Sequence, residues 1–173
     1  YNYYYQSNFS KILRIREGDK DIPVAFTNTF STSGTKTLKY SFTDKTVPGS
    51  IFEKCPALCG VRVSNTVTGI GGYAFSKTSI RHFELPATVT SYGSGVLYDC
   101  LELESVILPD NLTEIYDSMF RGCESLTVID IPDGVTKLGD FAFDGCASLA
   151  SIIIPAGVTY VGNYCFSDCS NLR

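Results

Sequence analysis

Thiols and one imidazole are the groups in this chain with the clearest chemical potential. The sequence has 173 residues, with seven cysteines and a single histidine, His82. A thiol beside an imidazole can act as a nucleophile, and clustered thiols can bind zinc. Cys55 and Cys59 lie four residues apart, as do Cys165 and Cys169, but neither pair has the matching second pair of ligands that a structural zinc site needs. We therefore expect no metal site and no cofactor.

Composition and charge narrow the possible classes of function. Hydrophobic residues make up 44% of the chain and charged residues 18%, which is globular. The formal net charge of −4 argues against a nucleic-acid partner, and no segment has the roughly 20 apolar residues of a membrane span. Residues 1–50 hold seven basic and four acidic residues, whereas residues 51–173 hold seven and fourteen. The chain therefore changes character near Gly49, and its second part is acidic.

An internal repeat is the main feature of the acidic part. Units start at large apolar residues, at intervals of 23, 22, 23, 23 and 23 residues: Phe52, Phe75, Leu97, Phe120, Phe143 and Phe166. With the first residue of a unit counted as zero, position three is Cys55, Thr78, Cys100, Cys123, Cys146 and Cys169. Apolar residues recur at positions six, nine, eleven, fifteen and eighteen, and proline follows position eleven in four units. Such periodicity is typical of a solenoid.

A unit of this length cannot enclose a core alone, so its apolar residues must pack on their copies in neighbouring units. The alternation that ends at position eleven predicts a short strand, which the following proline ends because it has no N–H. Strands one turn apart are expected to pair in parallel at about 4.8 Å. A second extended segment is expected at positions fifteen to eighteen, before a glycine turn.

The repeat also resembles a known family. The unit that carries the resemblance most completely reads Cys146-Ala-Ser-Leu149-Ala-Ser-Ile152-Ile-Ile154-Pro155-Ala-Gly-Val158-Thr159-Tyr-Val161-Gly162. It is similar to the BspA-type leucine-rich repeat over roughly residues 51–173. The resemblance implies a leucine-rich-repeat solenoid of about five 23-residue repeats, with short parallel strands on its concave face. It also implies an adhesin-like surface protein that binds a protein ligand and shares no catalytic motif with its relatives.

Two features depart from the family pattern. Thr78 replaces the cysteine of its column, and the chain ends soon after Leu172, in the middle of a repeat. The second departure indicates a fragment or an incomplete last turn.

Five of the seven cysteines share position three. We expect a ladder of buried free thiols there, because a free cysteine packs as a small hydrophobic residue and Thr78 occupies the same column. A disulfide framework is the alternative for an extracellular chain, although the number of cysteines is odd. Thiols that face the core cannot be activated by His82, so thiol catalysis is not expected.

The positions that the core leaves free are the candidates for a binding site. Positions eight and ten point away from the core, and Ile107, Val128 and Ile153 occupy them on adjacent units. They predict an apolar patch on the order of 300 Å² or less. Strand propensity on an open face, or coverage by a second copy, is the alternative explanation. The predicted ligand-binding residues of the concave face are Arg62, His82, Glu84, Ile107, Val128, Asp130 and Ile153.

The first fifty residues predict a tail and a cap. Residues 1–9, rich in tyrosine, are assigned to a tail or linker, and residues 10–50 to an N-terminal β cap over the first layer of the solenoid. Leu38, Tyr40 and Val47 fall at positions nine, eleven and eighteen of an earlier unit, so the cap includes a degenerate repeat. Residues 51–173 are assigned to the repeats.

Together these features predict a non-enzymatic protein-recognition module of a secreted or cell-surface protein, with a host extracellular protein as one class of partner. Two alternatives stay open: a passive spacer in a larger surface protein, and a glycan-binding module that uses Tyr92, Tyr98, Tyr116 and Tyr160. The sequence contains no signal peptide, so the extracellular location rests on the resemblance.

Overall fold

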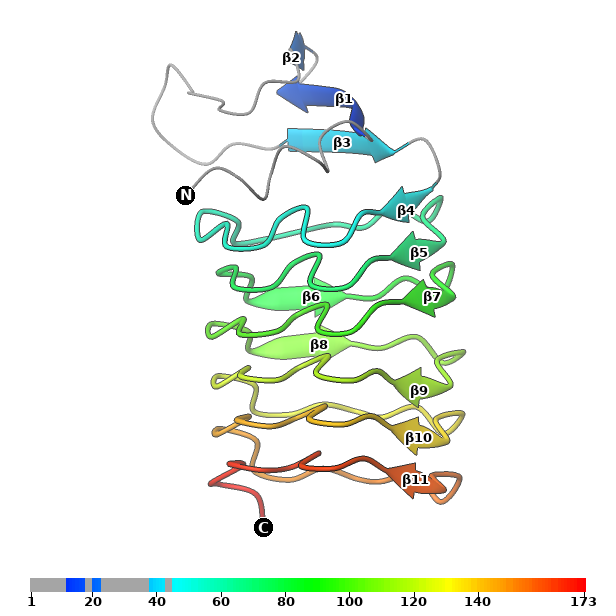
Figure 1. Cartoon of the computed structure of the whole chain (residues 1–173), viewed down its shortest axis with the longest axis vertical. Coiled ribbons are helices and arrows are strands. Elements are labelled where there is room, and N and C mark those ends of the chain that lie inside the picture. Colours follow the sequence, from blue (N-terminus) through cyan, green and yellow to red (C-terminus); the bar gives the residue numbers. More distant parts are fainter. Residues whose placement is uncertain (1–11, 18–19, 23–37, 43–44) are drawn as a thin grey trace.

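The computed structural model describes residues 12–17, 20–22, 38–42 and 45–173, with side chains from residue 45 onward. The described residues form a stack of coils below a small sheet (Figure 1). They contain short strands and no helix. The predicted β-rich solenoid is therefore confirmed. The expected tail at residues 1–9 lies outside the described residues, and the boundaries of tail, cap and repeats stay a prediction.

Three antiparallel strands precede the coils. β1 (Ile12–Glu17), β2 (Lys20–Ile22) and β3 (Leu38–Phe42) form a sheet in the order β2-β1-β3. Leu38 and Tyr40, which the sequence placed on a coil strand, pair with β1 in this sheet. This pairing separates them from the stack.

Val47, the third residue of the degenerate repeat, has a different place. It lies in β4 (Thr46–Val47), which pairs in parallel with β5 (Gly69–Ile70) of the next coil. Val47 is buried, with 3% exposure. The earlier unit is thus divided, and only its second half joins the stack.

Each coil contributes a two-residue strand at positions seventeen and eighteen. These strands form two parallel sheets: β4, β5 and β7 (Ser91–Tyr92), and then β9 (Glu114–Ile115), β10 (Lys137–Leu138) and β11 (Tyr160–Val161). Leu138 pairs with Ile115 in the preceding coil and with Val161 in the following one. Equivalent residues therefore lie directly over one another.

The strand expected in the alternating run that ends at position eleven appears in two coils, at positions eight to ten. β6 (His82–Glu84) and β8 (Ser105–Ile107) pair in parallel. Proline removes a backbone donor shortly after this segment. At the second segment the flanking amides extend the ladder, since Thr136 N donates to Thr113 O at 2.9 Å and Gly139 N to Ile115 O at 2.8 Å. Within residues 45–173 the second segment forms a strand in six coils, whereas the first segment forms one in two coils only.

Tight turns follow these strands, and each has two residues in the left-handed region, at positions twenty-one and two. At position twenty-one, φ is 56° at Tyr73, 56° at Phe141 and 54° at Tyr164. This left-handed conformation costs a residue with a side chain about 1–2 kcal/mol of free energy. A backbone hydrogen bond to the next coil stabilises the conformation of Phe141, because its N–H donates to Asn163 O at 2.9 Å. At position two, Gly122 and Gly145 adopt φ of 71° and 74° without a side-chain clash.

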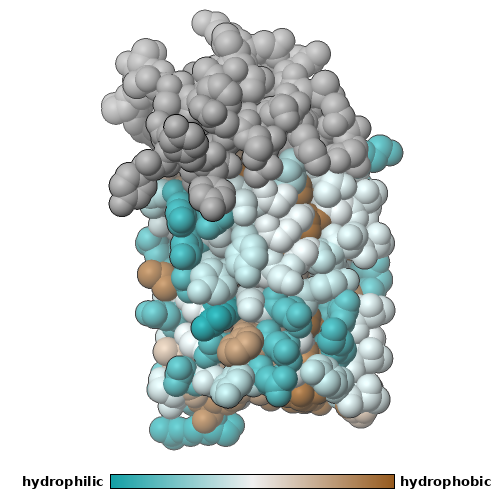
Figure 2. All heavy atoms as spheres, viewed as in Figure 1, coloured by the Kyte–Doolittle hydropathy of each residue, from teal (hydrophilic) through white to brown (hydrophobic). Residues whose placement is uncertain are grey.

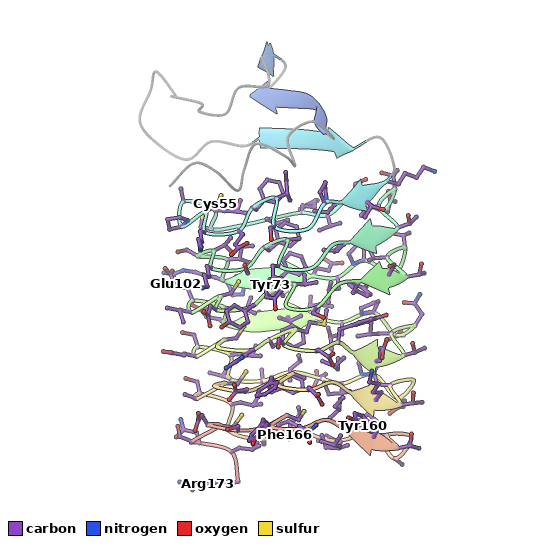
Figure 3. The ribbon with its side chains drawn as sticks, viewed as in Figure 1. Cys55, Tyr73, Glu102, Tyr160, Phe166 and Arg173 are labelled. Carbon is purple, nitrogen blue, oxygen red and sulfur yellow. The ribbon has the colours of Figure 1, made fainter. Side chains whose placement is uncertain are left out.

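The core consists of side chains that pack on their own copies. The ring of Phe143 stacks between those of Phe120 and Phe166, with centroids 5.5 Å away on each side. At position nine, Phe83, Val106 and Ile129 are 2%, 9% and 3% exposed. Figure 3 shows the side chains repeated from coil to coil, with Phe166 and Tyr160 in the last one. The predicted columns are therefore confirmed.

Ile131 and Ile153 provide a test of the strand phase. Ile131 is 9% exposed at position eleven, whereas Ile153, at position ten, is 83% exposed. Ile131→Ala should lower the free energy of unfolding by about 2–5 kcal/mol, because it leaves a cavity. Ile153→Ala should lower it by less than about 0.5 kcal/mol. Urea unfolding measures both, and equal losses would show that the assigned phase is wrong.

Candidate functional site

The seven predicted binding residues all lie at the surface, in the columns of positions eight and ten. We call this surface the strand face; it comprises Arg62, His82, Glu84, Ile107, Val128, Asp130 and Ile153. β6 and β8 set its geometry, because Phe83 and Val106 at their centres point into the core. The residues on either side of them must then point outward.

The part of the strand face around His82 is polar and internally paired. Nδ1 of His82 lies 2.8 Å from Ser105 Oγ, and its Nε2 lies 3.9 Å from a carboxylate oxygen of Glu104. The guanidinium of Arg81 lies 3.2 Å from Glu102 and 3.6 Å from Glu104. Exposed pairs of this kind contribute about 0–1 kcal/mol each to stability. His82 is thus a surface hydrogen-bonding residue within a small charge network.

The part of the strand face in the later coils is apolar and uncovered. Ile107, Val128 and Ile153 are 64%, 54% and 83% exposed. They surround Asp130, which shares a column with Ile107 and Ile153 and follows Val128 by two residues. No ion pair or side-chain hydrogen bond within residues 45–173 involves Asp130. Three apolar side chains and one free carboxylate therefore share this surface.

A groove lies where β6 and β8 end, and sequence reasoning missed it. It has a volume of about 530 Å³ and is lined by Glu84, Leu85, Pro86, Ala87, Ile107, Leu108, Pro109, Asp110 and Asn111. Pro86 and Pro109 end the two strands, and the chain turns away from the face just after them. The column of prolines is the signal that could have located it. Glu84 and Ile107 connect the groove to the strand face.

The four tyrosines considered for glycan binding do not gather into one platform. Tyr92 is 8% exposed and its hydroxyl donates to Val89 O at 3.1 Å. Burial raises its pKa to about 12. Tyr116 packs on the Tyr92 ring at 5.4 Å, whereas Tyr160 lies near Lys137. Tyr98 belongs to a different set of contacts, so no open row of rings results.

Tyr98 takes part in a row of cations and rings that the sequence did not reveal. The Arg121 guanidinium lies 5.7 Å from the Tyr98 ring and 4.9 Å from the Phe141 ring, and its Nε is 2.8 Å from Asp144. Lys77 approaches Tyr98 from the preceding coil at 5.5 Å. These contacts join successive coils.

In Figure 2 the side turned to the viewer is mostly polar, with apolar residues scattered over it.

The cysteines are all free, and the predicted ladder of thiols is confirmed. Cys123 is fully buried and its thiol donates to Leu97 O of the preceding coil at 3.2 Å. The same bond, at 3.1–3.2 Å, is made to the preceding unit by Cys100, Cys146 and Cys169. The Thr78 hydroxyl instead donates within its own unit, to Phe75 O at 2.8 Å.

Burial keeps these thiols protonated. It raises the pKa of Cys123 well above its ordinary value, and the neighbouring Cys100 and Cys146 raise it further. Burial also raises the pKa of Cys165 to about 12. Within the described residues no three Cys, His, Asp or Glu side chains meet as a metal site would require. The thiols are therefore suited to donating hydrogen bonds rather than to nucleophilic attack.

Comparison with known proteins places this geometry among repeat proteins. Six copies of a family model described as "BspA type Leucine rich repeat region" match residues 45–173. A leucine-rich repeat protein from Bacteroides ovatus is 27% identical, with a TM-score of 0.69 over 71% of this chain and 32% of that chain. The T. pallidum leucine-rich repeat protein is 26% identical, with a TM-score of 0.56 over 74% of this chain and 50% of that chain. These matches confirm the predicted leucine-rich-repeat fold.

The match covers part of those proteins only. The chain spans about a third of the Bacteroides ovatus protein and half of the T. pallidum protein. No curated protein matches the chain. The described part of the chain has no helix with the length and apolar character of a membrane span.

The buried thiols predict a stability that falls at alkaline pH. Their pKa in the folded chain lies above the ordinary thiol value of 9.0. Their contribution to stability is therefore complete below pH 9.0 and is lost as the pH rises, because the thiols of the unfolded chain ionise first. Each should lower the free energy of unfolding by about 1.4 kcal/mol per pH unit above that value.

Urea unfolding at pH 8 and pH 10 measures this loss. Cys123→Ala should reduce the difference between the two pH values, whereas the same change at the exposed Cys59 should not. Apart from these two cysteines, the groups that titrate between pH 8 and pH 10 are the same in both variants. The difference between their pH dependences therefore reports the thiol of Cys123. An equal pH dependence in the two variants would contradict a protonated buried thiol at Cys123.

Proposed function

Because the chain belongs to the BspA-type leucine-rich repeat family, we propose that it is a non-enzymatic recognition module that binds a protein ligand through the strand face. The family resemblance supports a place in a secreted or cell-surface protein. It also supports a ligand of the extracellular class, such as a matrix or plasma protein of a host. The module acts by presenting a fixed surface rather than by moving protons or electrons.

The exposed apolar group on the strand face carries the proposal. Ile107, Val128 and Ile153 are 64%, 54% and 83% exposed, although most apolar columns of the stack are buried. Apolar clusters with a polar rim mark interaction sites, and here Glu84 and Asp130 supply charges beside the cluster. A partner that fully covers such a side chain gains about 1.5–3 kcal/mol for each.

The surroundings of the chemically active groups support a non-enzymatic role. His82 is bonded to Ser105 at the surface, and the thiol of Cys123 donates to a backbone carbonyl in the core. A nucleophilic side chain is activated by an adjacent base, by a lowered pKa or by a metal, whereas burial raises the pKa of the Cys123 thiol. The groove beside Ile107 is lined by apolar, proline, amide and acidic residues without a basic one. Binding is therefore the activity that these side chains favour.

Immobilised matrix and plasma proteins, together with a glycan array, test the proposal on the purified chain. We expect at least one protein to bind. The triple variant Ile107→Ser, Val128→Ser and Ile153→Ser should weaken that binding at least tenfold, or about 1.4 kcal/mol, because it removes the apolar contact. Leu101→Ser is the matched control, since Leu101 is 51% exposed and lies outside the strand face, at position four. The thermal midpoint should change little in either variant.

Three results would contradict the proposal. Binding that the triple variant leaves intact would remove the strand face as the site. If no protein binds, a passive spacer becomes the better description. Glycan binding that survives the triple variant would point instead to a glycan-binding module.

A further inference from the structure

We propose that the partner of the strand face is a helical segment whose contact stripe alternates basic and apolar side chains. This inference rests on the proposed function and specifies the chemistry of its ligand. It is carried by the order of residues along the stack, by unpaired carboxylates, by the spacing of the coils and by the groove.

Position ten carries Arg62 in the first coil and then presents an alternating pattern over four successive coils: Glu84, Ile107, Asp130 and Ile153. Glu84 lies directly opposite Ile107 in the pairing of β6 with β8. The pairing of β10 with β9 and β11 keeps the next coils in register with the coil of Ile107. All four side chains are exposed. The strand face therefore carries an acidic, apolar, acidic, apolar row along the stack axis.

The carboxylates of this surface lack internal partners. Within residues 45–173, no ion pair involves Glu84, Asp130 or Asp110 of the groove, and none involves Arg62, whereas four other basic residues are paired with acids: Lys77, Arg81, Arg121 and Lys137. Complementary charge guides association and disfavours wrong partners. Free carboxylates between exposed isoleucines therefore match a partner with lysine or arginine between apolar residues.

The spacing of the coils favours a helix over a strand as the partner. Successive coils lie about 4.8 Å apart. Side chains three or four residues apart on a helix are about 5–6 Å apart, whereas those on one face of a strand are about 6.6 Å apart. The four sites span about 14 Å, close to the roughly 16 Å of helix axis between residues i and i+11. A stripe at i, i+4, i+7 and i+11 then places a basic, an apolar, a basic and an apolar residue in order.

The groove gives the first apolar side chain of the partner a place to pack. Ile107, Pro86 and Pro109 form apolar parts of its lining, and Glu84 and Asp110 supply the carboxylates. A leucine of the partner can pack against Ile107 and the prolines while the preceding lysine reaches Glu84. Apolar and charged contacts are thus made by adjacent residues of one stripe.

A labelled alanine-rich peptide of about 20 residues, long enough to form a helix, tests the inference. It carries Lys, Leu, Lys and Leu at i, i+4, i+7 and i+11, and its binding to the whole purified chain is followed by fluorescence anisotropy. We expect binding that weakens as salt is added. The double variant Glu84→Gln and Asp130→Asn should weaken it about tenfold. Glu124→Gln, an exposed acid at position four, should not change it.

Charge reversal makes the test specific. A second peptide with Glu in place of both Lys residues should bind the variant Glu84→Lys and Asp130→Lys about tenfold more tightly than it binds the unchanged chain. The inference is overturned if reversal gives no such recovery. It is also overturned if a peptide in the order Lys, Lys, Leu, Leu binds equally well, or if no peptide binds at about 1 mM. Should the protein ligand nevertheless depend on Ile107, Val128 and Ile153, the proposed function survives with a partner of different chemistry.

Discussion

Register-preserving contact between successive coils is the constraint on which the structure depends. Backbone donors of one coil are satisfied by an adjacent coil, as Gly139 N is by Ile115 O of the coil before it and Phe141 N by Asn163 O of the coil after it. A slip of one residue would move a column such as Phe120 and Phe143 out of the core. Each column must therefore keep one kind of side chain, and this requirement produces the repeat.

The same constraint explains residues whose local preferences are not met. Tyr73 and Phe141 adopt a left-handed backbone that costs free energy, because each turn presents its amide to a carbonyl of the next coil. Cysteine suits position three because its thiol is small, apolar and able to donate to the carbonyl of the coil before it. The apolar columns of the stack are thereby committed to the core, and recognition is left to the columns that face outward.

The residues of those outward columns differ from coil to coil, so one part of the strand face is polar and another part is apolar. Around His82 the charges pair with one another through Arg81 and Glu104, whereas Asp130 in a later coil has no such partner among residues 45–173. The exposed Ile107 and Ile153 lie in the same column as Asp130. One regular backbone thus supports a polar region and an apolar, acidic region side by side, and no rearrangement of the coils is needed to present both.

The sequence by itself determined the columns, because a period of 23 residues assigns each side chain to the core or to the surface. It was enough to predict the buried thiols, the burial of Ile129 and the exposure of Ile107, Val128 and Ile153. It did not determine which extended segment forms the strands, the antiparallel pairing of β3, or the groove after Pro86 and Pro109. Those features arise from contacts between chain segments that no local pattern encodes: the backbone pairing between adjacent coils, the pairing of β1 with β3, and the space left where two strands end together. Tertiary structure alone decided them, because each depends on how distant segments meet.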